Sequence, residues 1–178
     1  MRSGLLLALP LVFAAAVPVS AQQTSTTTTA FDAWVLGCSS RTQADNKTVK
    51  ACEIRSTIVI RDEKSNQQGV AAVVAIGRAS VDKPDMQFVT QLPINAVLNV
   101  PVRITSKDDK PVIELAFVAC QPQLCTASVN VTDKQISALK KIGDNFHVAY
   151  RNQAGQDVKI EGSTKGFNQA LDALVREK

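Results

Sequence analysis

Apolar and polar residues alternate along most of this chain. Residues 50–61 show the pattern best, because Cys52, Ile54 and Ile58 fall on one side of an extended chain while Glu53 and Arg55 fall on the other. A period of two is typical of a half-buried strand. The same alternation predicts strands in residues 86–92, 100–104, 112–119, 125–131 and 146–150, with another beginning at 158. The unbroken apolar run Val70–Ile76 predicts a strand covered on both faces.

Two short segments change to a helical period. Thr132 followed by Gln135 is typical of a capping box, and Ile136 and Leu139 then keep helical spacing. Apolar residues also repeat at three- and four-residue intervals from Phe167 to Val175. Eight or nine short strands with frequent turn signals therefore predict an all-β fold, an antiparallel β-sandwich with one or two short helices. A parallel α/β sheet is disfavoured, because the strands do not alternate with helices of crossover length.

Residues 1–21 resemble a cleaved secretory signal peptide. A basic Arg2 precedes the apolar run Leu5–Val17, and small residues before the end place the cut after Ala21. The alternative is a membrane anchor, but a run of 13 residues is short of the roughly 20 that a spanning helix needs. Residues 22–30 are polar and of low complexity, which predicts a disordered lead-in. The folded domain is expected over 31–176, with no integral membrane segment in the mature chain.

Export changes how the four cysteines are interpreted. An even number of cysteines in an oxidising compartment indicates disulfides, and four cysteines allow three pairings. We favour Cys38 with Cys52 and Cys120 with Cys125, because each pair joins sequence neighbours across one turn. Zinc is disfavoured because these spacings do not match structural sites and no histidine lies nearby. The four residues between Cys120 and Cys125 also exceed the spacing of disulfide exchangers. We expect structural disulfides, with no metal and no cofactor.

Composition and charge exclude several classes of function. The chain has 178 residues, 45% hydrophobic and 20% charged, which suits one globular domain. Its net charge of +4 is spread along the sequence, so we do not expect a nucleic-acid partner. Aromatic residues make up only 4%. Trp34, four residues before Cys38, suits the core of a sandwich better than an exposed binding anchor.

No catalytic motif is present in the sequence. His147 is the one histidine, no Gly-x-Ser-x-Gly elbow presents a nucleophile, and the glycines form no phosphate-binding loop. We therefore predict no catalytic residue and a non-enzymatic protein. The alternative is a periplasmic enzyme whose site forms only in three dimensions, around His147 and a nearby carboxylate.

Six fragments in order resemble the invasion-associated locus B family. They are Phe31-Asp32-Ala33-Trp34-Val35-Leu36-Gly37-Cys38, Cys52-Glu53-Ile54, Leu92-Pro93 before Leu98, Phe117-Val118-Ala119-Cys120, Cys125-Thr126-Ala127, and Ser163-Thr164-Lys165-Gly166-Phe167 before Ala170-Leu171. The resemblance runs from Phe31 to about Leu174.

The resemblance implies a Gram-negative envelope protein with an immunoglobulin-like β-sandwich and two local disulfides. It carries no catalytic residue over to this chain, but it implies that Trp34, Phe117 and Phe167 belong to the core. It also implies export to the periplasm or outer membrane, a protein partner in the envelope or on a host cell, and a role in host-cell association or invasion. The loops 39–48, 80–85 and 106–111 are our candidates for contact, since a sandwich binds through its end loops or by adding a strand at a free edge.

Overall fold

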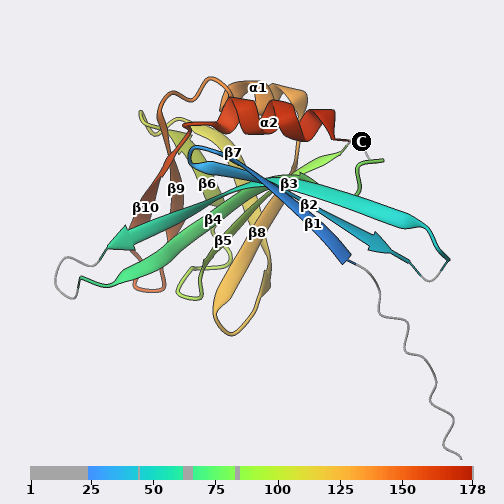
Figure 1. The fold of residues 1–178 in the computed structure, drawn as a ribbon. Helices are drawn as coiled ribbons and strands as arrows, with labels where there is room; N and C mark the ends of the chain where they lie inside the picture. The colour runs from blue at the N-terminus through green and yellow to red at the C-terminus, as the bar shows by residue number, and fades with distance from the viewer. Residues whose placement is uncertain (1–23, 44, 62–65, 83–84, 178) are drawn as a thin grey trace, which may run out of the picture.

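The computed structural model describes residues 24–43, 45–61, 66–82 and 85–177 (Figure 1). The predicted signal peptide lies outside them. The strands are β1 Thr24–Phe31, β2 Trp34–Thr42, β3 Thr48–Arg61, β4 Gln68–Arg78, β5 Met86–Pro93, β6 Val102–Ser106, β7 Pro111–Cys120, β8 Leu124–Val131, β9 Asn145–Arg151 and β10 Asp157–Ser163. The helices are α1 Asp133–Leu139 and α2 Phe167–Arg176.

The strands follow the order β1-β2-β3-β4-β5-β8-β7-β6-β9-β10, and every pairing is antiparallel. Strand β7 joins two layers, because Ile113–Leu115 pair with β6 and Ala116–Cys120 pair with β8. The first layer holds β1–β5 and β8, and the second holds β6, β9 and β10. The prediction of an all-β, antiparallel, sandwich-like fold with two short helices is confirmed.

Alternation along the strands fills the space between the layers. From the first layer, Ile54, Val74 and Phe88 are buried, and from the second, Ile104 and Val148 are buried. The two helices cover one end of the sandwich (Figure 1). Helix α2 contributes Phe167, Ala170, Leu171 and Leu174 to the core, whereas Val175, which the helical period also places on the apolar face, is 51% exposed. The sandwich is stabilised because the inward apolar faces of the two layers are buried against each other.

The capping box that was predicted for the first helix is present. The Gln135 backbone N–H donates to the Thr132 hydroxyl at 3.3 Å, and the Thr132 backbone N–H donates to the Gln135 side-chain oxygen at 2.9 Å. The two bonds satisfy donors that a helix N-terminus otherwise leaves unpaired. An ion pair of 2.8 Å between Lys140 and Asp172 then joins the end of α1 to α2.

The prediction of a disordered lead-in over residues 22–30 is wrong for 24–30, which form most of β1. This strand pairs along its whole length with β2, from Thr24 opposite Arg41 to Phe31 opposite Trp34. Low complexity concealed the strand because its side chains are polar on both faces, so they show no apolar alternation. Threonine nevertheless has a high β propensity, since its branched Cβ suits an extended chain.

Two other expectations also need correction. Much of the predicted 39–48 loop is strand, because β2 continues to Thr42 and β3 begins at Thr48. The prediction that Val70–Ile76 is covered on both faces is wrong as well. Val70 is 59% exposed, and Val73 and Ala75 are only half-buried. No described segment covers the outward side of β4, and this open side carries the candidate site.

Candidate functional site

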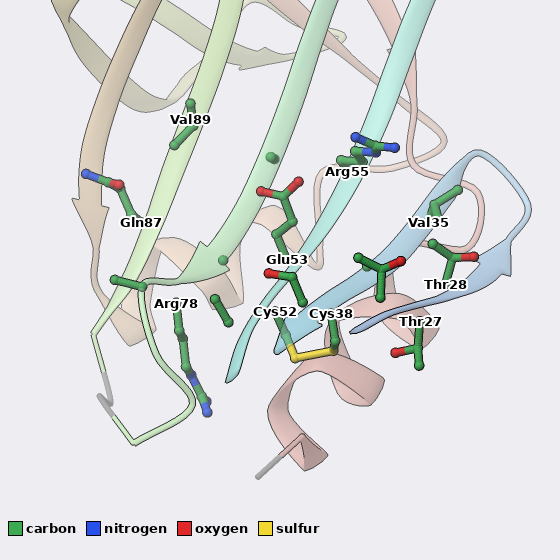
Figure 2. A pocket seen from close by; sticks show the side chains of 17 residues that line it. Thr27, Thr28, Val35, Cys38, Cys52, Glu53, Arg55, Arg78, Gln87 and Val89 are labelled. Carbon is green, nitrogen blue, oxygen red and sulfur yellow. A yellow bond between two sulfur atoms is a disulfide. The ribbon is translucent and has the colours of Figure 1, made fainter. Parts of the chain in front are cut away.

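A hollow of about 450 Å³ lies on the outer face of the first layer, over β1–β5 (Figure 2). Its lining includes small residues on β2, β3 and β4 and just after β4, namely Gly37, Ser39, Ala51, Ala75, Gly77 and Ala79. Two charged side chains, Glu53 and Arg55, rise from β3 within it. Alternate residues of a strand share a face, so these two side chains stand on the same side of the sheet.

The strand register places uncharged neighbours without polar side chains on both sides of each charge. Glu53 lies opposite Gly37 on β2 and Gly77 on β4, while Arg55 lies opposite Val35 and Ala75. A Cβ added at residue 77 would lie 2.8 Å from the Glu53 Cβ, so only glycine leaves Glu53 its position. A Cβ added at residue 37 would meet no heavy atom within 4 Å. The space above Gly37 is therefore open.

Neither charge has a polar partner in the described part of the chain. The side chains of Glu53 and Arg55 form no ion pair within 4.0 Å and no hydrogen bond with each other or with any other described residue. Opposite charges two residues apart thus stand unpaired in this hollow. Sequence reasoning missed this pair, because its signal lies in the cross-strand neighbours and not in residues adjacent along the chain.

The structure pairs Cys38 with Cys52 and Cys120 with Cys125. The first bond joins directly opposite residues of β2 and β3, and both of its cysteines are buried beneath the hollow. The second bond joins the ends of β7 and β8. Both cross-links therefore tie neighbouring strands of the first layer.

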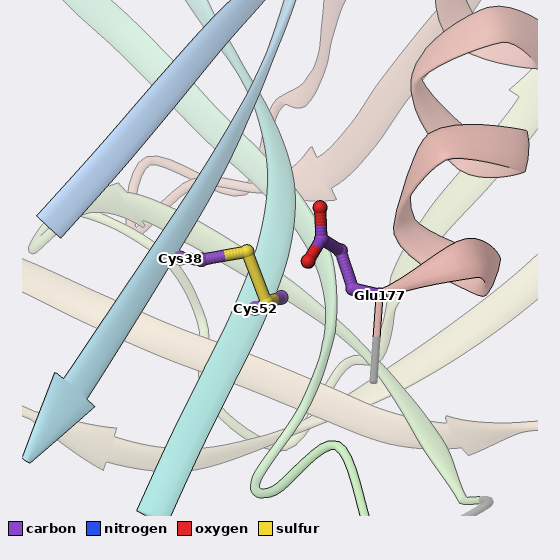
Figure 3. A group of neighbouring side chains, drawn as sticks. All are labelled: Cys38, Cys52 and Glu177. Carbon is purple, nitrogen blue, oxygen red and sulfur yellow. A yellow bond between two sulfur atoms is a disulfide. The ribbon is translucent and has the colours of Figure 1, made fainter.

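Glu177 lies near the Cys38–Cys52 bond, and its carboxylate and the two sulfurs lie within 4.8 Å of one another (Figure 3). Cysteine binds metals as a thiolate, and a disulfide has no thiolate to offer. The Glu177 carboxylate instead forms an ion pair with Lys50. This cluster is therefore a disulfide beside an ion pair, at the point where α2 ends against β3.

The structure places Trp34 between the layers, with 2% of its surface exposed. Its ring centroid lies 4.9 Å from that of Phe167 and 6.2 Å from that of Phe146. The indole N–H donates to the Ser163 carbonyl at 2.9 Å, which satisfies the one polar atom of the ring. Phe167 is buried, whereas Phe117 is half-buried and packs against the edge of the core. None of the three is an exposed anchor.

The outer face of the second layer carries ion pairs. Arg103 binds Glu114 at 2.8 Å, Arg151 binds Asp157 at 2.9 Å, and Lys159 binds Asp109 at 2.6 Å. The hydrogen bond from Arg151, with the positive charge of its guanidinium, lowers the pKa of Asp157. The hydrogen bond from Lys159 likewise lowers the pKa of Asp109. Lys159 lies on β10 and Asp109 in the β6–β7 turn, so this pair connects two edges of the layer.

His147 is half-buried on the same face. The register aligns Thr105, His147 and Glu161 in one row across β6, β9 and β10. His147 Nε2 lies 3.8 Å from a Glu161 carboxylate oxygen, but His147 Nδ1 and the Thr105 hydroxyl have no hydrogen-bond partner among the described residues. A hydroxyl, an imidazole and a carboxylate are thus neighbours, but no hydrogen bond connects the hydroxyl to its base. Thr105 is also 4% exposed, which hides it from a substrate.

Strand β1 leaves one edge of the first layer open. It ends the strand order and pairs only with β2 among the described strands. Its residues Thr24–Ala30 are exposed and carry no charge and no proline. Native edges are commonly blocked by charged side chains, proline or bulges. The described length of β1 has none of these, so the backbone groups that face away from β2 are available to another strand.

Comparison with known proteins agrees with this architecture. The family model described as "Invasion associated locus B (IalB) protein" matches residues 34–175. The crystal structure of invasion associated protein B from Bartonella henselae is similar, with a TM-score of 0.63 and 19% sequence identity, over 84% of this chain and 95% of that one. No curated protein sequence matches the chain. Neither described helix is long and apolar enough to cross a membrane.

Proposed function

Because this chain belongs to the invasion-associated locus B family, we propose that it is an exported, non-enzymatic binding protein of the bacterial envelope that contributes to association with host cells. Two disulfides support export, since such bonds persist in oxidising compartments. Residues 1–21, with their apolar run Leu5–Val17, supply the export signal in this proposal. The partner is a protein of the envelope or of a host cell.

The observation that carries the proposal is the open edge of β1. An extended peptide can add to such an edge through main-chain hydrogen bonds, a common mode of peptide recognition. Eight residues of β1 offer a longer continuous contact than the loop at 43 and 45–47 or the turn at 106–111, and the 80–85 loop lies partly outside the described residues, at 83–84. We therefore place the protein contact at this edge, ahead of the loops first considered.

A periplasmic enzyme at His147 is the second candidate. The row of Thr105, His147 and Glu161 holds the residue types of an acyl-transfer site. Such a site needs a nucleophile bonded to its base, and here the hydroxyl is buried and unbonded. Replacing His147 by glutamine tests this candidate. If the protein is a binding protein, the His147→Gln variant should still bind to cells. If the protein is an enzyme that uses His147, the variant should lose its catalytic activity.

The first experiment places the protein in the cell. Cells that produce the native chain are fractionated, and intact cells are treated with protease before blotting. Digestion on intact cells would make direct contact with host molecules credible. Protection, with release by osmotic shock, would confine the protein to the periplasm and contradict a direct role in host-cell contact.

The edge itself is tested by adding charge to it. Ser25→Lys and Thr29→Lys should weaken capture of the partner or adhesion to cells, because edge charges oppose strand addition, and neither residue lines the hollow on the outer face. Thr57→Lys is the matched control, since Thr57 is also exposed but lies on β3, which has strands on both sides. Equal binding by the edge variants and the control would move the contact away from β1.

A further inference from the structure

We propose that the hollow on the first layer binds a zwitterionic group of headgroup size, with its cationic nitrogen at the Glu53 carboxylate and its oxyanion at the Arg55 guanidinium. Residues Thr26–Thr28 of β1 border this site, but its two charges lie on β3, whereas the proposed protein contact uses the free backbone edge of β1. The site can therefore be present whether or not the protein contacts host cells.

The first argument is the charge pattern. Glu53 and Arg55 are two residues apart on β3, so their backbone positions lie about 7 Å apart on one face. Neither has a partner among the described residues, whereas the cations of the opposite layer lie beside carboxylates. A ligand with one charge of each sign, separated by a short carbon link, complements both groups at once. A ligand with a single charge complements only one of them.

The second argument is the pair of glycines beside Glu53. Gly77 is required by packing, because a Cβ there would collide with Glu53. Gly37 is not required, since its space is open and its backbone does not have positive φ. Glycine inside a strand costs stability relative to residues with side chains, and it often marks close approach of a ligand. Gly37 therefore leaves room over Glu53 that any side chain would fill.

The third argument is size and lining. A volume of about 450 Å³ falls within the range of small-molecule sites, which is about 300–1,000 Å³. The lining contains no aromatic ring to stack on a sugar. Arg78 also lines the hollow, and its Nε has no hydrogen-bond partner in the described structure. Figure 2 shows the Arg78 side chain directed away from Glu53, so we assign the oxyanion to Arg55.

The test is a titration of the full mature chain with phosphoethanolamine, followed by two-dimensional NMR of the labelled backbone. Ethanolamine and inorganic phosphate, which each carry half of the probe, are titrated in parallel. We expect shifts concentrated on residues 35–39, 51–55 and 75–79, with a dissociation constant on the order of 1 mM. The half-probes should bind more weakly, and added salt should weaken all binding.

Variants then distinguish the contribution of the two charges to binding from that of the open space above Gly37. Glu53→Gln and Arg55→Gln should each weaken phosphoethanolamine binding about fivefold, the upper range for an exposed charge. The matched controls are Glu114→Gln and Arg103→Gln, which make the same charge changes on the other layer and should have no effect. The double swap E53R/R55E should restore binding, because a zwitterion can reverse its direction. Gly37→Val keeps both charges but fills the hollow, and it should abolish binding.

Two vesicle preparations identify the source of the group. Binding to vesicles that contain phosphatidylethanolamine, but not to phosphatidylglycerol alone, would support a lipid headgroup. Binding of the soluble probe without vesicle binding would support a free solute. The proposal is overturned if phosphoethanolamine causes no shifts at the hollow, or if Glu53→Gln, Arg55→Gln and Gly37→Val bind it as well as the native chain.

Discussion

The two outer faces of this sandwich use charged residues in different ways. On the second layer, Arg103, Arg151 and Lys159 each lie within hydrogen-bond distance of a carboxylate. On the first layer, Glu53 and Arg55 have no such partner and stand beside glycine, alanine and valine. The paired face satisfies its own charges, while the unpaired face leaves both charge and space for something else. For locating a binding site, whether a charged side chain already has a partner is therefore more informative than the presence of the charge.

The largest expected effect comes from the residue that joins the two layers. Trp34→Ala should lower the free energy of unfolding by about 3–5 kcal/mol, since it opens a cavity against Phe146 and Phe167. Trp34→Phe should cost less, because it keeps an aromatic ring and loses mainly the bond to Ser163. Urea unfolding followed by circular dichroism measures both. A loss below about 1 kcal/mol for the alanine variant would contradict a core role.

The next effect separates the two disulfides of the first layer. Replacing Cys38 and Cys52 by alanine should cost about 3 kcal/mol, because that bond closes the larger loop, with a sequence separation of 14. Replacing Cys120 and Cys125 should cost about 2 kcal/mol, because their separation is 5. Urea unfolding compares the two variants under the same conditions. The reverse order would show that loop length does not control the stabilisation here.

A smaller effect distinguishes the two glycines beside Glu53. Gly37→Val should stabilise the protein by about 0.5–1 kcal/mol, since the side chain enters open space and the strand loses a glycine. Gly77→Val should destabilise it by about 1–3 kcal/mol, because its Cβ would collide with Glu53 and with the Cys52 carbonyl. Thermal unfolding of both variants measures the difference. If Gly37→Val also destabilises, the hollow is not open in solution.

The smallest effect concerns acid stability of the paired face. The pKa of Asp157 is lowered by Arg151 in the folded protein, so the unfolded chain takes up a proton first as the pH falls. The stabilisation is therefore complete above the ordinary aspartate pKa near 4, and is lost as the pH falls through the lower folded value. Asp157→Asn should flatten the dependence of unfolding free energy on pH below 4. An unchanged slope would show that this ion pair contributes nothing.

Periodicity predicted most of the fold but failed where side chains were polar on both faces. Strands such as β3 and β5 alternate, because one face meets the core, and the pattern reveals them. Strand β1 meets no core along most of its length, so Thr24–Ala30 show no alternation. Its place depends on pairing with β2, a contact that no local pattern records. Spacing along the chain could indicate the two cysteine pairs, because each pair joins strands that are adjacent in sequence.

By itself, the sequence determined the β class, the capping box, the helical face of α2 and the family, since each depends on residues close together or in fixed order along the chain. Only the tertiary structure decided which residues surround Glu53 and Arg55, and which carboxylates meet Arg103, Arg151 and Lys159. The physical reason is strand register. It brings residues from separate segments into contact, and a shift of one residue would turn each of these side chains to the opposite face.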